Sequence, residues 1–170
     1  MYCPACGHLN LPGNDECGVC HLSLAHLDGP NPNDRLERSL VTDPVSVLNP
    51  RPPVTVAADA DLSHAIARMI ELSVGAVLVV DGANRLVGIL TERDFLLKVA
   101  GQLGFEAQPV ARFMTPDPET VGPADTLAFA LGKMDAGGYR HLPVVEAGRP
   151  VGVISVRDML RHVTGLCQDG

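Results

Sequence analysis

Four cysteines near the N-terminus have the spacing of a metal-binding site. They form two Cys-x2-Cys pairs, Cys3 with Cys6 and Cys17 with Cys20, and ten residues separate the pairs. Four thiolates presented in this way suit a closed tetrahedral Zn²⁺ site, which leaves no coordination position for water. The pattern therefore predicts one structural zinc ion.

Two other chemistries remain open for these cysteines. The segment Cys-Pro-Ala-Cys-Gly at 3–7 resembles the iron-binding knuckles of rubredoxin-like sites, so iron is the alternative metal. Disulfides are disfavoured because residues 1–24 contain no apolar secretory signal, and we expect a reducing, cytoplasmic location. Gly7 and Gly18 adjoin the two pairs and are expected to form the tight turns that bring thiolates toward a metal.

A hydroxyl and a carboxylate recur three residues apart in two places, at Thr91 with Asp94 and at Ser155 with Asp158. At a helix start, a hydroxyl and the free backbone N–H groups favour a phosphate. An ionised Asp only accepts hydrogen bonds, which suits the two hydroxyls of a ribose. The same pattern also forms a capping box that needs no ligand. Two copies, each following a Val-Gly pair in an aliphatic strand, favour nucleotide binding over capping alone.

Basic side chains lie close to these pairs in the sequence. Arg140 and His141 precede a predicted strand and could bind phosphate, and the alternative is a surface arginine paired with an acid. Arg93 and Arg157 each precede the Asp of a pair, so they could contact phosphate or a neighbouring carboxylate. Because Arg140 and His141 accompany only the second pair, Ser155 with Asp158, we expect that pair to dominate phosphate binding.

The elements that must position these residues occur twice. Shifting the sequence by 65 positions from Pro44, and by 64 after the turn near residue 82, superimposes sixteen identical residues. Each copy reads as β-α-β-β-α, with apolar residues at helical spacing in the long helix and continuous aliphatic strands. The predicted elements are 54–56, 62–70, 76–80, 86–90 and a helix from 92, then 120–121, 127–134, 142–145, 151–154 and a helix from 156.

The repeats resemble a known family. Gly-Ile-Leu-Thr-Glu-Arg-Asp at 88–94 and Gly-Val-Ile-Ser-Val-Arg-Asp at 152–158 resemble the signature of cystathionine-β-synthase (CBS) domains. Residues 110–115 resemble the usual lead-in to the second domain of a pair, whereas 47–50 departs from that pattern. Thr120 matches a polar pocket position of the family, although a Thr in a strand is also simply a good β-former.

The resemblance implies an architecture and a ligand class. The fold class is then α/β (α+β), with two CBS units packed as a pseudo-twofold pair and a small N-terminal zinc ribbon. Such pairs bind adenine nucleotides or S-adenosylmethionine, regulate an associated activity and form homodimers. The predicted divisions are a zinc ribbon at 1–24, a linker with a helical lead-in at 25–43, a first unit at 44–105 and a second unit at 106–166.

Composition narrows the function. The 170 residues are 46% apolar but only 4% aromatic, so the core must be aliphatic, and the net charge is −7. Residues 1–24 contain no Lys or Arg, which disfavours nucleic acid and favours a protein partner for the ribbon. No catalytic constellation or membrane segment is apparent. We expect a regulatory nucleotide sensor, and the rivals are a nucleic-acid-binding regulator controlled by the repeats and a structural dimer with empty pockets.

Overall fold

The computed structural model describes residues 3, 5–11, 14–24 and 35–168. In this part of the chain, helices and strands follow the duplicated order that the sequence predicts. They are α1 Arg35–Thr42, η1 Val45–Leu48, β1 Thr55–Ala57, α2 Leu62–Glu71, β2 Ala76–Val80, β3 Leu86–Thr91, α3 Glu92–Asp94, η2 Phe95–Val99, η3 Val110–Arg112, β4 Thr115–Pro116, α4 Leu127–Gly137, β5 His141–Glu146, β6 Arg149–Ser155 and α5 Val156–Gln168.

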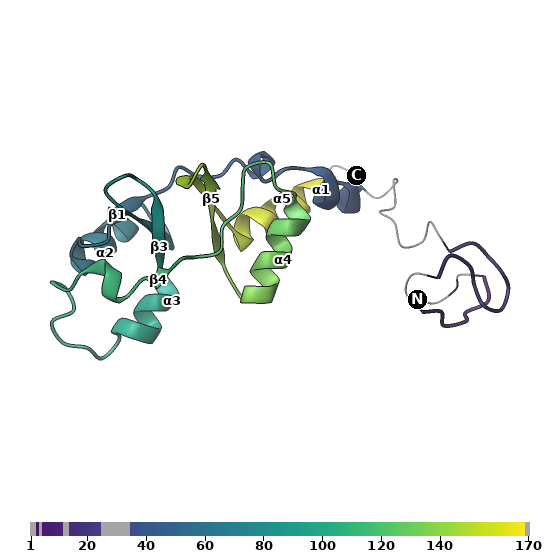
Figure 1. Cartoon of the computed structure of the whole chain (residues 1–170), viewed down its shortest axis with the longest axis horizontal. Helices are drawn as coiled ribbons and strands as arrows, with labels where there is room; N and C mark the ends of the chain where they lie inside the picture. The colour runs from purple at the N-terminus through teal and green to yellow at the C-terminus, as the bar shows by residue number, and fades with distance from the viewer. Residues whose placement is uncertain (1–2, 4, 12–13, 25–34, 169–170) are drawn as a thin grey trace.

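The first unit is built on a sheet of four strands in the order β1-β2-β3-β4. β1 runs parallel to β2, β2 pairs with β3 in the antiparallel sense, and the short β4 adds to the outer edge of β3. Figure 1 shows α2 and α3 next to the strands of this sheet. The prediction of strand 76–80 is confirmed at both ends. The predicted final helix does begin at Glu92, but it continues as the π-helical segment η2.

The second unit repeats this arrangement with fewer regular pairs. β5 and β6 form an antiparallel ribbon. Val121 makes a single parallel bridge to Val144, so the predicted strand 120–121 is reduced to one bridging residue. Arg51 bridges Val153 on the far side, in the position that β4 takes beside β3.

The segments that lead into the two units exchange places. Val45 precedes the first unit's strands but is buried in the core of the second unit. Val110 and Phe113 precede the strands of the second unit but are buried in the core of the first. The exchange is symmetric, because Val45 and Val110 are equivalent positions of the repeat. Each aliphatic core is therefore completed by chain from the other repeat, which ties the two units together.

The glycine that both repeats share in the Val-Gly pair makes this crossing possible. A Cβ on Gly88 would lie 2.4 Å from Sδ of Met114, and a Cβ on Gly152 would lie 2.6 Å from Cβ of Pro50. Any side chain at either position would occupy the space of the crossing segment. The repeated Gly therefore has a packing reason independent of any ligand.

Helix α1 belongs with the second unit. Residues 25–34 of the predicted linker lie outside the described residues, whereas 35–42 form the predicted helical lead-in. α1 contacts α4 and α5, as Figure 1 shows, and Leu40 packs on the second core. The buried Ser39 hydroxyl bonds Asp43 and lies 2.8 Å from Nε2 of His162 on α5. None of the helices in the described ranges is long and apolar enough to cross a membrane.

Candidate functional site

A cleft of about 620 Å³ opens where the two units meet. Five of the nine residues predicted to bind nucleotide line it. They are Arg140, His141, Ser155, Arg157 and Asp158. β5 and β6 deliver these side chains, since His141 pairs with Ser155 at the ends of the two strands. The first unit contributes the opposite wall, including Gly75 and Glu92.

The Ser155–Asp158 pair forms a capping box at the start of α5. Oδ2 of Asp158 accepts hydrogen bonds from the Ser155 backbone N–H at 2.8 Å and from the Ser155 hydroxyl at 2.6 Å. Burial acts to raise the pKa of Asp158, but these two hydrogen bonds hold it below its usual value. The carboxylate is therefore ionised. Its other oxygen, Oδ1, meets only Arg161 at 3.2 Å among the described side chains, and that guanidinium is largely exposed.

The equivalent pair in the first unit has the same cap and a different surrounding. Oδ2 of Asp94 accepts from the backbone N–H and hydroxyl of Thr91 at 2.8 and 2.7 Å. Oδ1 lies 2.8 Å from Nζ of Lys98 and accepts from the Thr115 hydroxyl at 3.2 Å. Burial acts to raise the pKa of Asp94, and the Lys98 and Thr91 hydrogen bonds outweigh it. Both oxygens of this carboxylate are satisfied within the protein.

His141 stands between the two units. A Cβ added to Gly75 would lie 3.1 Å from its ring and 3.6 Å from the Glu92 carboxyl carbon, so the imidazole occupies the space beside that glycine. Burial lowers the pKa of His141. Glu92 and Asp158 oppose this shift, while Arg157 and Arg140 add to it. The imidazole is therefore neutral at pH 7 and can donate one hydrogen bond and accept another.

Four predicted residues lie outside this cleft. Thr91 and Asp94 are held in the cap described above. Arg93 is exposed, and it does not line the cleft. Thr120 is half-buried, and its carbonyl accepts from Lys133 at 2.9 Å. The structure thus brings together five of the six predicted residues of the second unit and leaves Thr120 and the three predicted residues of the first unit apart from them.

Three further charged residues line the cleft, and the sequence analysis did not single them out as site residues. Arg161 lies one helical turn after Asp158 on α5, and this spacing could have revealed it. Glu92 begins α3 and faces His141 from the first unit. Arg51 reaches the cleft only because the crossing lead-in pairs with β6, so nothing in its sequence context points to it.

The four N-terminal cysteines converge as the spacing predicts. All four Sγ atoms lie within 4.8 Å of one another, and Cys3–Cys20 and Cys6–Cys17 are both 3.6 Å apart. A tetrahedral zinc ion with Zn–S distances of ~2.3 Å needs sulfurs roughly 3.8 Å apart, so the donor set fits. All are free thiols, which excludes the disulfide alternative in this structure.

The two halves of this cluster have matching backbone turns. The N–H of Cys3 donates to His8 and that of Gly7 to Cys3, while the N–H of Cys17 donates to Leu22 and that of His21 to Cys17. Both Gly7 and Gly18 lie in turns, as predicted, and the positive φ values of these two turns fall on Gly7 and His21. Gly18 also donates its N–H to a side chain that the sequence analysis did not single out.

That side chain is Asn10, which is buried between the two turns. Its Oδ1 accepts from Gly18 at 3.0 Å, and its Nδ2 lies 3.7 Å from Sγ of Cys17. Backbone N–H groups of Cys20 and Val19 lower the pKa of Cys17 to about 6. At Cys6 the His8 backbone acts to lower the pKa, but burial and the neighbouring thiols raise it to about 12. Cys17 is therefore the cysteine whose surroundings favour the thiolate form that a metal requires.

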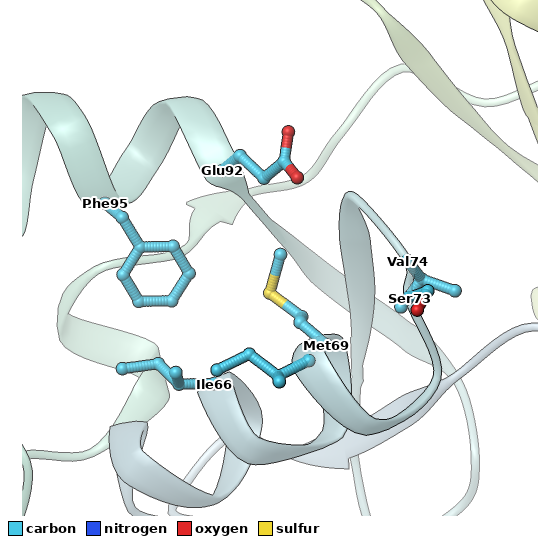
Figure 2. Close-up of a pocket in the computed structure, with 7 residues that line it drawn as sticks. Ile66, Met69, Ser73, Val74, Glu92 and Phe95 are labelled. Carbon is cyan, nitrogen blue, oxygen red and sulfur yellow. The ribbon is translucent and has the colours of Figure 1, made fainter.

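A second, apolar hollow of about 400 Å³ lies on the first unit. Figure 2 shows Ile66, Met69 and Phe95 around it, with Glu92 at the start of α3. It contains none of the basic side chains or hydroxyl–carboxylate pairs predicted to bind a nucleotide. Its chemistry is therefore that of a packing surface.

Comparison with known families matches the CBS domain twice, at residues 45–101 and 110–165. An uncharacterized 17.7 kDa protein of Acidianus ambivalens is 37% identical over 107 residues, which are 62% of this chain. The chain matches 64% of that relative, and only 20% of the CBS domain-containing protein CBSCBSPB5 of Arabidopsis thaliana, to which it is 42% identical over 109 residues.

Two solved structures share the fold of the repeats. A CBS-domain containing protein from Agrobacterium tumefaciens is 34% identical with a TM-score of 0.63, and the match covers 71% of this chain and 90% of that one. The CBS domain pair of protein MJ0100, in complex with 5′-methylthioadenosine and S-adenosyl-L-methionine, is 25% identical with a TM-score of 0.62. That match covers 74% of this chain and 96% of that one.

Proposed function

The chain belongs to the CBS domain family, and from this premise we propose that its repeats form a regulatory module that binds an adenine nucleotide or another adenosyl ligand in the cleft. One observation carries the proposal: the ionised carboxylate of Asp158 lines the cleft, whereas its counterpart Asp94 is saturated by Lys98 and Thr115. The adenosyl ligands of the MJ0100 pair support the ligand class.

Each group in the cleft has a chemical role in this proposal. Asp158 accepts hydrogen bonds from the ribose hydroxyls, because an ionised carboxylate has only acceptors. Arg140, Arg157 and His141 donate to phosphate oxygens, and Ser155 at the start of α5 adds the field of the helix N-terminus. Thr91, Arg93 and Asp94 remain candidates for a second, weaker site in the first unit, and Thr120 remains a candidate pocket residue of the second unit.

The test is ligand-induced stabilisation of the full chain. We expect adenine nucleotides to raise the melting temperature and Asp158→Asn to abolish the shift, with Asp94→Asn as the matched control that keeps it. No shift with any adenosyl ligand at millimolar concentration contradicts the sensor and leaves a structural dimer with empty pockets. A shift lost only in Asp94→Asn would move the site to the first unit.

For the N-terminal segment we propose a zinc ribbon that holds one Zn²⁺ through Cys3, Cys6, Cys17 and Cys20. The convergence of the four sulfurs supports it. A structural zinc site contributes ~10–16 kcal/mol of apparent binding energy, which such a small segment needs in place of a core. Elemental analysis should find one zinc per chain and none after Cys17→Ser, while Cys167→Ser retains it. Iron in place of zinc contradicts the assignment.

We further propose that the ribbon contacts a protein partner and so transmits the state of the module. The absence of Lys and Arg from residues 1–24, together with Asp15 and Glu16, supports a protein over a nucleic acid. We expect no gel shift of duplex DNA or RNA at physiological salt. A shift that disappears when residues 1–24 are deleted would favour the nucleic-acid-binding regulator instead.

A homodimer completes the proposed function. Ile70 lines the apolar hollow of Figure 2 and is 73% exposed. Leu96 and Leu97, which follow the lining residue Phe95 in η2, are 75% and 72% exposed, and these apolar side chains support coverage by a second copy. Sedimentation should give twice the chain mass, and Leu97→Lys should give the monomer. A monomeric parent at micromolar concentration contradicts the proposed homodimer.

The proposed site of action is the reducing cytoplasm, and we assign the module no catalytic step.

A further inference from the structure

Four arginines surround the cleft, and they are more than one phosphate requires. Arg51, Arg140, Arg157 and Arg161 line it together with two carboxylates, Glu92 and Asp158. With His141 neutral, the lining carries four positive and two negative charges, a net charge of +2 in a chain whose net charge is −7. The cleft is therefore a cationic site within an acidic protein, which favours anionic ligands.

In the part of the chain that the structure describes, most of these guanidinium groups have no carboxylate partner. Within the described residues, Arg51, Arg140 and Arg157 form no ion pair, and the pair between Arg161 and Asp158 is 68% exposed on the arginine side. Salt bridges at that exposure contribute little. Arg140 and Arg157 are thus not engaged in surface ion pairs with acids, which was the alternative interpretation. All four guanidinium groups are available to a ligand.

The backbone holds these arginines in one place at an electrostatic cost. Arg157 and Arg161 are four residues apart on α5, where like charges destabilise a helix. Arg140 is tied to the start of α5 by the hydrogen bond from the Val156 N–H to its carbonyl at 3.1 Å. Arg51 is fixed beside β6 by the bond from the Val153 N–H to its carbonyl, also at 3.1 Å. An anion in the cleft relieves the repulsion among them.

The fold itself does not require this cluster. At the equivalent positions of the repeat, the first unit has Pro116 for Arg51, Gly75 for Arg140 and Leu97 for Arg161. Only Arg157 has a basic counterpart, Arg93. Three of the four charges are therefore particular to this cleft and not part of what the repeat needs to fold.

We infer that the cleft selects a nucleoside di- or triphosphate over the monophosphate and over S-adenosylmethionine, and that Arg51 and Arg161 bind the phosphates beyond the first. This inference rests on the proposed function. A monophosphate offers a single phosphate group to four guanidinium groups, and the sulfonium and ammonium groups of S-adenosylmethionine bring positive charge toward a lining that is already cationic. A longer phosphate chain supplies acceptors for guanidinium groups on both sides of the cleft, from the lead-in segment and from α5.

The experiment compares binding of ATP, ADP, AMP and S-adenosylmethionine to the full chain by calorimetry, in magnesium-free buffer near physiological salt. We expect ATP to bind at least tenfold more tightly than AMP. Arg51→Gln and Arg161→Gln should each weaken ATP about tenfold and AMP less than threefold. Arg85→Gln is the matched control, because Arg85 pairs with Asp81 in the turn between β2 and β3, away from the cleft. Inorganic triphosphate should compete with ATP, and added salt should weaken ATP more than AMP.

The outcomes separate this inference from the proposed function. If AMP or S-adenosylmethionine binds as tightly as ATP and Asp158→Asn abolishes that binding, the nucleotide site stands and the selection for polyphosphate is wrong. Equal losses of AMP and ATP affinity in Arg51→Gln and Arg161→Gln also overturn the role of these two residues. If none of the four ligands binds, both the inference and the proposed function fail. Thermal melts without ligand confirm that each variant is folded.

Discussion

The two units share a fold and a capping box, yet they treat the same carboxylate differently. In the first unit, Oδ1 of Asp94 is bound by the Lys98 ammonium and the Thr115 hydroxyl. The equivalent residues in the second unit are His162, which bonds Ser39 instead, and Pro50, which has no hydroxyl. Two substitutions thus turn a saturated structural carboxylate into one that lines a cleft.

This difference shows that the hydroxyl–carboxylate motif does not by itself mark a ligand site. The cap is formed in both units, so the capping-box interpretation is correct as far as it goes. What distinguishes the second unit is its lack of the two groups that bind Oδ1 of Asp94. One of them, Lys98, lies four residues after Asp94, and the other, Thr115, comes from the crossing lead-in segment. The following predictions test the comparison, from the largest expected effect to the smallest.

The largest effect concerns the ligand. A nucleotide at a hundred times its Kd contributes ~2.7 kcal/mol, which is roughly 5–10 °C in melting temperature for a protein of this size. Asp158→Asn should lose this shift, because the amide no longer offers two acceptor oxygens. The double variant Pro50→Thr with His162→Lys should also reduce it, because it rebuilds the first unit's surroundings around Asp158. An undiminished shift in the double variant would contradict the claim that the groups next to the carboxylate distinguish the two units.

Next comes the close crossing of the lead-in segments. Gly152→Ala should destabilise the protein by about 2 kcal/mol, because its Cβ meets the rigid ring of Pro50. Gly88→Ala should cost less, because the clashing atom belongs to the flexible side chain of Met114. Denaturant unfolding of both variants measures the difference. Equal costs would mean that the two crossings are equally adaptable.

The third effect isolates Lys98. Lys98→Met removes one of the two partners of Oδ1 of Asp94 and also the bonds to the carbonyls of Phe113 and Met114, so we expect a loss of about 1.5 kcal/mol in the free energy of unfolding. The matched change Arg161→Met should cost under about 0.5 kcal/mol, because that pair is exposed. The pKa of Asp94 is lowered in the folded protein. The stabilisation of the fold by the ionised carboxylate is therefore complete above about pH 4, and it is lost as the pH falls through the lowered pKa. The gap between parent and Lys98→Met should therefore narrow in acid.

The smallest effect is the pH dependence of ligand binding. Burial lowers the pKa of His141, so the free cleft has a neutral imidazole, and a bound phosphate should raise that pKa. Binding then takes up a proton, and nucleotide affinity should increase severalfold as the pH falls from about 8 to about 6. His141→Gln should remove the part of this dependence that is not due to titration of the nucleotide itself. Calorimetry in buffers of different ionisation enthalpy measures the proton directly.

Much of the fold follows from local patterns. The duplication, the aliphatic strands and the helical spacing of Leu62, Ala65 and Met69 predict the repeated β-α-β-β-α order, because each depends only on residues close in sequence. The four cysteines predict their own convergence for the same reason. Asn10 was not predictable, since an Asn in a loop gives no signal that it will be buried between two turns.

What the sequence determined by itself is therefore the type and order of the elements, the cysteine cluster and the two caps, all of them short-range features. Tertiary structure alone decided which cap lines a cleft. The crossing of the lead-in segments places Arg51 beside Val153 and Thr115 beside Asp94, although each pair is far apart in the chain. Each aliphatic core needs a residue from the other repeat to close it, and that long-range packing brings Thr115 to Asp94 and Arg51 to the cleft. The ion pairs of Asp94 with Lys98 and of Asp158 with Arg161 are local in the chain.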